Sequence, residues 1–91
     1  MALARTQAEI ANVFVSTTDT LLTEENAERW NTIITNPSTD ICYVTLGDSV
    51  SADYFTYKLT RGSTIECGPW RGEIHAVMAN TPAYIMISEG Y

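Results

Sequence analysis

The chain has 91 residues, which suffices for one domain with a thin hydrophobic core. Five Lys and Arg against eleven Asp and Glu give a net charge of −6 at pH 7. Because the few cations are scattered along the chain, the sequence disfavours nucleic acid and anionic membrane surfaces as partners.

The N-terminal segment, residues 1–15, has no unbroken apolar stretch, since polar residues interrupt it. It does not match a secretory signal, so we expect a chain made and kept in a reducing cytoplasm. Cys42 and Cys67 are too few for a disulfide scaffold and lack the C-x-x-C spacing of a zinc site. We favour the interpretation of both cysteines as small buried hydrophobes, and a disulfide between them remains the alternative. Cys67 precedes a Gly-Pro turn, which predicts that this residue is exposed.

The amino-acid composition predicts an all-β fold. Thirteen Thr, eight Ile and five Val are β-branched residues, which suit a pleated surface, and the chain contains a single Lys. Taken in chain order, alternating apolar and polar residues predict eight short strands. They cover residues 10–16, 18–22, 29–35, 41–46, 53–59, 63–67, 73–78 and 83–88.

The first strand has a competing interpretation, because Thr6 and Glu9 have capping-box spacing and could begin a short helix over residues 7–12. The last two strands are expected to face the core through alternate residues. These are Ile74, Ala76, Met78, Ile85 and Ile87.

Eight strands spaced about ten residues apart indicate a compact antiparallel sandwich, jelly roll or small barrel. Residues 18–91 form the single sandwich domain, and residues 1–17 an N-terminal arm or an added edge strand. The alternation alone does not distinguish jelly-roll from immunoglobulin-like strand pairing.

The residues do not indicate an enzyme. The single histidine, His75, lies in the middle of a strand on the face opposite Ile74, which favours a solvent or interface histidine. No G-x-S-x-G turn, calcium loop or phosphate-binding loop is present in the sequence. We therefore expect no catalytic residues, no bound metal and no cofactor.

Binding through aromatic surface is better supported. On the last strand, Tyr84 and Met86 share the face opposite Ile85 and Ile87, so this strand is apolar on both sides. Either a loop or another subunit covers the second side. The residues expected at an interface are Val13, Phe14, Trp30, Trp70, Tyr84, Met86 and Tyr91.

Several short motifs over residues 18–91 resemble a pattern in small β-sandwich virion proteins of tailed bacteriophages. An N-x-x-R turn, Asn26 to Arg29, leads into an Ile34-Thr-Asn36 strand and a Val-Tyr-like strand at Cys42-Tyr-Val44. A turn of the form L-x-x-G-x-x-x-E follows over residues 59–66, then G-x-I-x-A over residues 72–76 and a final strand ending in Glu89.

The resemblance implies a structural protein of the virion, most simply a capsid decoration (cement) protein or a head fibre. Such a protein would form a homotrimer, bind the major capsid protein and sit on the capsid surface after assembly in the host cytoplasm. The alternatives are a tail, collar or fibre component of the same virion, or a carbohydrate-binding module that uses Trp30 and Trp70 as stacking platforms.

Overall fold

The structure is a computed structural model that describes residues 8–90, and all eight predicted strands occur in it. The strands are β1 (Ala8–Val15), β2 (Thr20–Thr23), β3 (Asn31–Thr35), β4 (Cys42–Leu46), β5 (Tyr57–Leu59), β6 (Thr64–Glu66), β7 (Ile74–Met78) and β8 (Ala83–Gly90). No helix long and apolar enough to cross a membrane occurs in this part of the chain.

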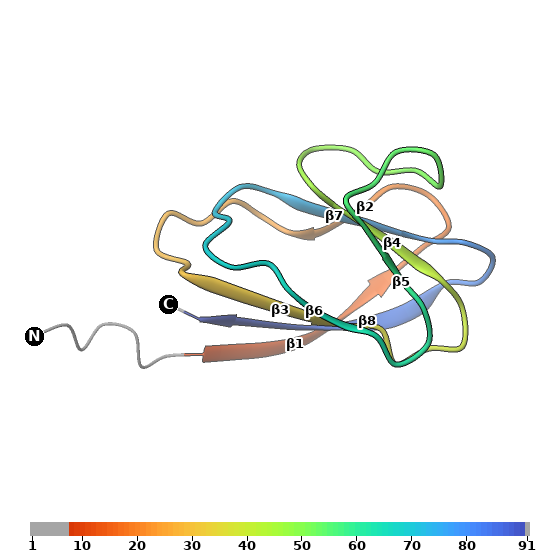
Figure 1. Cartoon of the computed structure of the whole chain (residues 1–91), viewed down its shortest axis with the longest axis horizontal. Coiled ribbons are helices and arrows are strands. Elements are labelled where there is room, and N and C mark those ends of the chain that lie inside the picture. The colour runs from red at the N-terminus through yellow and green to blue at the C-terminus, as the bar shows by residue number, and fades with distance from the viewer. Residues whose placement is uncertain (1–7, 91) are drawn as a thin grey trace, which may run out of the picture.

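The strands form two four-stranded antiparallel sheets that pack face to face (Figure 1). Sheet A has the order β1-β8-β3-β6 and sheet B the order β2-β7-β4-β5. Strand β1 pairs with β8, β2 with β7, β3 with β6 and β4 with β5. This nested pairing is that of a jelly roll, which resolves the choice of topology that alternation left open.

The core lies between the sheets and is built by the alternation that the sequence predicts. Ile74, Ala76 and Met78 of β7 point inward and are buried, as are Ile85 and Ile87 of β8. The other buried core residues are Val15, Leu22, Ile34, Cys42, Val44, Leu59 and Cys67. Apolar side chains therefore fill the interior of the sandwich.

The N-terminal segment forms a strand rather than the alternative helix. All eight residues of β1 pair with β8, from Ala8 with Gly90 to Val15 with Ala83. Residues 8–15, within the segment 1–17 predicted as an arm or edge strand, are thus an edge strand of sheet A, and residues 1–7 of that segment lie outside the described residues.

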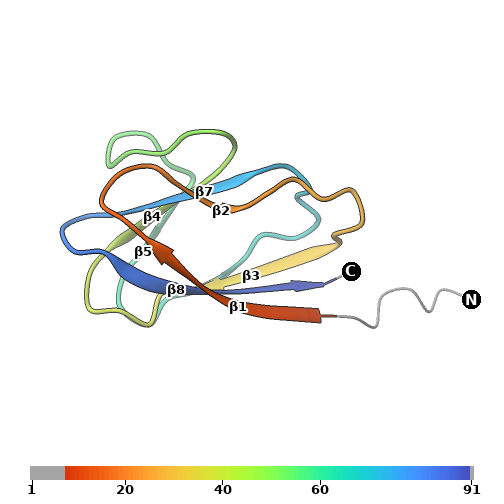
Figure 2. The ribbon, with the colours of Figure 1, turned by 180° about the vertical axis from the view of Figure 1, so that it is seen from behind.

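One predicted strand, residues 53–59, is too long. Only Tyr57–Leu59 join β4, because Ser51 and Tyr54 hydrogen-bond each other's backbone at 2.8 and 3.1 Å in a tight turn. The first hydrogen bond between the backbone of this segment and that of β4 is made at Thr56, whose amide donates to the Val44 carbonyl at 2.8 Å. Residues 47–56 therefore form a long loop between β4 and β5, drawn in green at the top of Figures 1 and 2.

A buried ion pair closes one end of the sandwich. Arg29 is fully buried, and its Nη1 lies 2.8 Å from Oε2 of Glu89, near the end of β8. The guanidinium also donates to the carbonyls of Glu24, Trp70 and Gly72 at 3.0, 3.1 and 2.6 Å. One side chain thereby ties sheet A to the two loops that connect β2 to β3 and β6 to β7.

Candidate functional site

His75 is the residue with the richest acid–base surroundings. Its Nδ1 lies 2.5 Å from Oδ1 of Asp19, and its Nε2 lies 3.1 Å from Oε1 of Glu73. Burial acts to lower the pKa of His75, but hydrogen bonds to Asp19 and Glu73 outweigh it, so the pKa is raised. Because carboxylates occupy both ring nitrogens, the arrangement suits a charged clamp and leaves neither nitrogen free to take a proton from a substrate.

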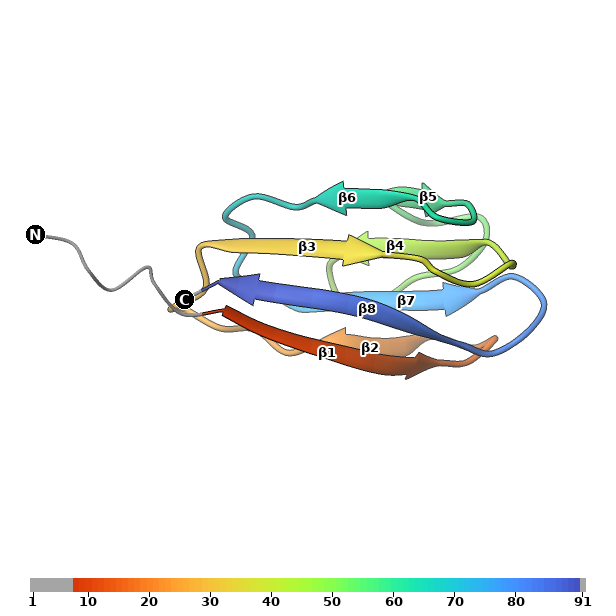
Figure 3. The same cartoon turned by 90° about the horizontal axis from the view of Figure 1, so that it is seen from below.

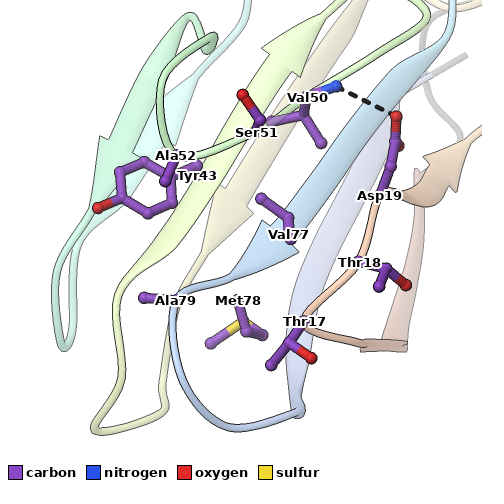
Figure 4. Close-up of a pocket in the computed structure, with 10 residues that line it drawn as sticks. All are labelled: Thr17, Thr18, Asp19, Tyr43, Val50, Ser51, Ala52, Val77, Met78 and Ala79. Atoms are coloured by element: carbon purple, nitrogen blue, oxygen red, sulfur yellow. Dashed lines mark hydrogen bonds between the residues drawn. The ribbon is translucent and has the colours of Figure 1, made fainter.

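A cavity of about 230 Å³ opens beside this cluster, between the loop over residues 47–56 and β7 (Figure 4). Its lining residues are Thr17, Thr18, Asp19, Tyr43, Val50, Ser51, Ala52, Val77, Met78 and Ala79. Asp19 is the one carboxylate among them, and it already accepts a hydrogen bond from the Val50 amide at 3.2 Å as well as contacting His75. The cavity is smaller than typical ligand pockets of about 300–1,000 Å³ and brings no acid–base pair together.

A second, shallower hollow of about 350 Å³ is acidic. It is lined by Glu25, Gly47, Asp48, Gly72 and Glu73. Among residues 8–90, no group of three or more His, Cys, Asp and Glu side chains is placed to hold a metal ion. The hollow therefore gives no ligand set for a cation.

Both cysteines are free and buried, and burial raises the pKa of Cys42 to about 12 and that of Cys67 to about 11. The prediction that Cys67 is exposed is wrong, because its side chain joins the core cluster between the sheets. Thiols with raised pKa values are poor nucleophiles. The interpretation of both residues as small buried hydrophobes is confirmed.

The outer face of sheet A is the most unusual surface of the molecule. It carries five large apolar side chains on three adjacent strands. Their exposed fractions are 71% for Ile10, 54% for Phe14, 37% for Ile33, 59% for Tyr84 and 40% for Met86. Figure 3 looks onto this sheet, and no described segment passes in front of β1, β8 or β3. We call these five residues the apolar face.

The strand register brings the apolar face together. Phe14 lies opposite Tyr84, and their rings meet edge to face with centroids 5.1 Å apart. Met86 lies opposite Thr35 of β3, and Ile10 lies opposite Ser88, which in turn pairs with Ile33. The apolar residues are therefore neighbours in one surface, in which Asn12, Thr35 and Ser88 are the small polar members.

Three of the residues predicted at an interface, Phe14, Tyr84 and Met86, lie on the apolar face. Exposure of Tyr84 and Met86 contradicts the alternative in which a loop covers the last strand. Val13, also predicted at an interface, does not lie on the apolar face, because it alternates inward with Val15 and packs against the core.

The two tryptophans do not belong to the apolar face, because Trp30 and Trp70 lie in loops outside the strands. Trp30 is half-buried, with its ring at 3.0–3.1 Å from the position of a side-chain carbon at Gly90. The Trp70 indole donates to the Glu73 carbonyl at 3.0 Å and is 36% exposed. Tyr91 lies outside the described residues.

Ile10 and Ile33 belong to the apolar face, yet sequence reasoning missed them. Alternation within β1 could have found Ile10, since it lies four residues before Phe14 on the same side of the strand. Ile33 could not have been found in this way, because β3 and β1 are brought together only through β8.

In comparisons with known proteins, the chain has no significant match to a family model, to a curated protein or to a solved structure.

Proposed function

We propose that this chain is a structural protein of a bacteriophage virion, and specifically a capsid decoration protein that oligomerises and stabilises the major capsid lattice. The observation that carries the proposal is the apolar face, five large hydrophobic side chains on the open side of sheet A. Contiguous exposed apolar surface marks protein or membrane interaction sites and ligand grooves, and of these a flat sheet face suits contact with another protein.

Three further features support a structural role. The motifs over residues 18–91 resemble those of small virion proteins. The jelly roll is used by viral capsid domains, although lectins and cupins share it, so the surface has to carry the argument. Both ring nitrogens of the single histidine are occupied by carboxylates, and both thiols are buried, which favours assembly over chemistry.

The mechanism would be burial of apolar surface at junctions between subunits, at about 25 cal/mol per Å² removed from water. Strand β1 offers a second means of contact. It is an edge strand of eight residues, and on its side away from β8 no described strand pairs with it. Such an edge can accept a strand from a neighbouring protein.

The test is co-assembly. The chain is produced together with the major capsid protein encoded in the same genome, and the particles are sedimented and analysed by mass spectrometry. We expect the chain to sediment with the particles at a copy number comparable with that of the major capsid protein. Absence from the particles, or a few copies confined to tails or collars, would contradict the decoration role.

A pair of variants sharpens this test. Phe14→Glu places a charge on the apolar face and should reduce incorporation into particles. Tyr54→Glu places the same charge on a tyrosine that is 64% exposed in the loop over sheet B, and it should assemble like the wild type.

A further inference from the structure

We propose that the apolar face is the docking surface for a second copy of this chain, with the two A sheets packed face to face around a two-fold axis. The inference rests on the structural role proposed above only in taking this face to be an assembly surface. It adds the partner and the packing geometry. A face-to-face pair is a dimer, and it differs from the homotrimer that the resemblance implies.

The distribution of charge is the first argument for a second copy as the occupant. The chain has a net charge of −6, so two copies repel each other over most of their surfaces. By strand alternation, the outer side of sheet A presents Glu66 as its one charged residue among those described, at the margin formed by β6. Its Oε2 accepts a hydrogen bond from Asn31 Nδ2 at 2.9 Å. This face is where two acidic copies approach with least repulsion, whereas a basic partner would gain nothing from it.

The available area is the second argument. The four strands of sheet A contain 8, 8, 5 and 3 residues. At about 3.4 Å along the strand and about 4.8 Å between strands for each residue, they cover roughly 400 Å² in plan. Protruding rings and aliphatic chains raise the accessible area above that plan value. The plan value is about four fifths of the roughly 500 Å² per partner that a specific interface requires, and the protruding side chains have to supply the rest.

The relief of the face is the third argument, because its centre is self-complementary. Along β8, the outward residues decrease in size from Tyr84 and Met86 to Ser88, and the Trp30 ring lies against Gly90 beyond them. A two-fold axis parallel to the sheets and perpendicular to the strands, level with Ile87, places β8 of one copy antiparallel over β8 of the other. It sets Met86 of each copy opposite Ser88 of the other. A large residue then meets a small one at the centre of the pair, as packed sheets about 10 Å apart require.

The experiment is sedimentation equilibrium of the full chain over a range of protein concentrations. We expect the mass to rise from 10.1 kDa to about twice that value. Tyr84→Glu, at the centre of the aromatic pair, should raise the dimer dissociation constant by at least about 30-fold. The matched variant Tyr54→Glu replaces a tyrosine of similar exposure, 64% against 59%, and should dimerise like the wild type.

A second measurement does not depend on any variant folding. Because dimerisation stabilises the folded state by mass action, the melting temperature of the wild type should increase with protein concentration. A wild type that stays monomeric, a mass of three copies, or equal weakening by both variants would overturn the proposal. If the chain is monomeric but binds capsids, the pairing is refuted and the decoration role stands. If the chain dimerises but does not bind capsids, the decoration role is refuted and the pairing stands.

Discussion

The outer faces of the two sheets are covered in different ways, although both carry apolar side chains. On sheet B, the loop over residues 47–56 lies across the sheet and brings Val50 down onto it, so that Val77 of β7 is only 7% exposed. On sheet A, Tyr84 and Met86 of β8 stand open to solvent. The loop covers part of sheet B and leaves Leu21 of β2 40% exposed, whereas no described loop covers sheet A, where the larger group of exposed apolar side chains lies.

Covering sheet B requires specific anchors. The Val50 amide donates to Asp19 (Figure 4), and Asp19 also contacts His75 of β7. The rings of Tyr43 and Phe55 pack with centroids 4.8 Å apart, which joins the loop to β4. No comparable loop occurs over sheet A in the described chain, because β4–β5 is the one connection between described strands of the same sheet, and every connection from sheet A leads to sheet B.

The largest effect should come from the ion pair that ties sheet A to two loops at one end of the sandwich. Arg29→Ala leaves Glu89 without its buried cation and three carbonyls without their donor, which should lower the free energy of unfolding by about 3–5 kcal/mol. Urea denaturation followed by circular dichroism measures it. Lys58→Ala, at an exposed cation of β5, is the control and should change stability by less than about 0.5 kcal/mol. Equal effects of the two variants would contradict a structural role for Arg29.

A charge placed on each outer face compares the two surfaces directly. Val77→Asp puts an unpaired carboxylate under the loop and should destabilise the protein by about 3 kcal/mol. Met86→Asp, at a residue that is 40% exposed on the open face, should cost only about 1 kcal/mol, mainly because Asp is unfavourable in a strand. Thermal denaturation at low protein concentration, where self-association contributes little, makes the comparison. Similar losses at both positions would show that sheet A is covered as well.

Removing two methyl groups from the loop is a milder change. Val50→Ala should destabilise by about 1.5 kcal/mol, because Val50 is buried against sheet B and each lost carbon is worth about 0.8 kcal/mol. Ile10→Ala removes more carbon from the apolar face, yet it should change the stability of the monomer by less than about 0.5 kcal/mol. The difference in stability between the two variants is measured from their denaturation midpoints, provided that the free energy of unfolding depends on denaturant concentration with the same slope in both. A larger loss at Ile10 would reverse the comparison.

The smallest effect should be a dependence on pH at the anchor of the loop. The pKa of His75 is raised in the folded chain, so the stabilisation by its charged form is complete below the unfolded pKa of about 6.5. It is lost as the pH rises through the folded pKa. Melting temperatures between about pH 5 and pH 9 should therefore fall with pH in the wild type.

The control for this prediction is His75→Gln, whose side chain can still hydrogen-bond but does not titrate. Its melting temperature should lack the decrease in this pH range. If the wild type and the variant follow the same profile, the clamp formed by Asp19, His75 and Glu73 does not contribute to folding.

Much of the fold could be predicted because alternation is a local property. Side chains in a strand point to opposite faces in turn, so Ile74, Ala76 and Met78 could be placed in the core from the sequence alone. Strand 53–59 was predicted too long because the pattern of Tyr54 and Phe55 continues the alternation. The backbone bonds between Ser51 and Tyr54 that end it are not encoded by any periodicity.

The sequence by itself determined the all-β class, the number of strands and the apolar character of both sides of β8, since these depend on neighbours along the chain. Only the tertiary structure decided the jelly-roll pairing, the burial of Cys67 and the meeting of Asp19 with His75, residues 56 positions apart. It also decided which outer face stays open. Coverage of a sheet depends on where a distant loop returns, and long-range packing sets that position.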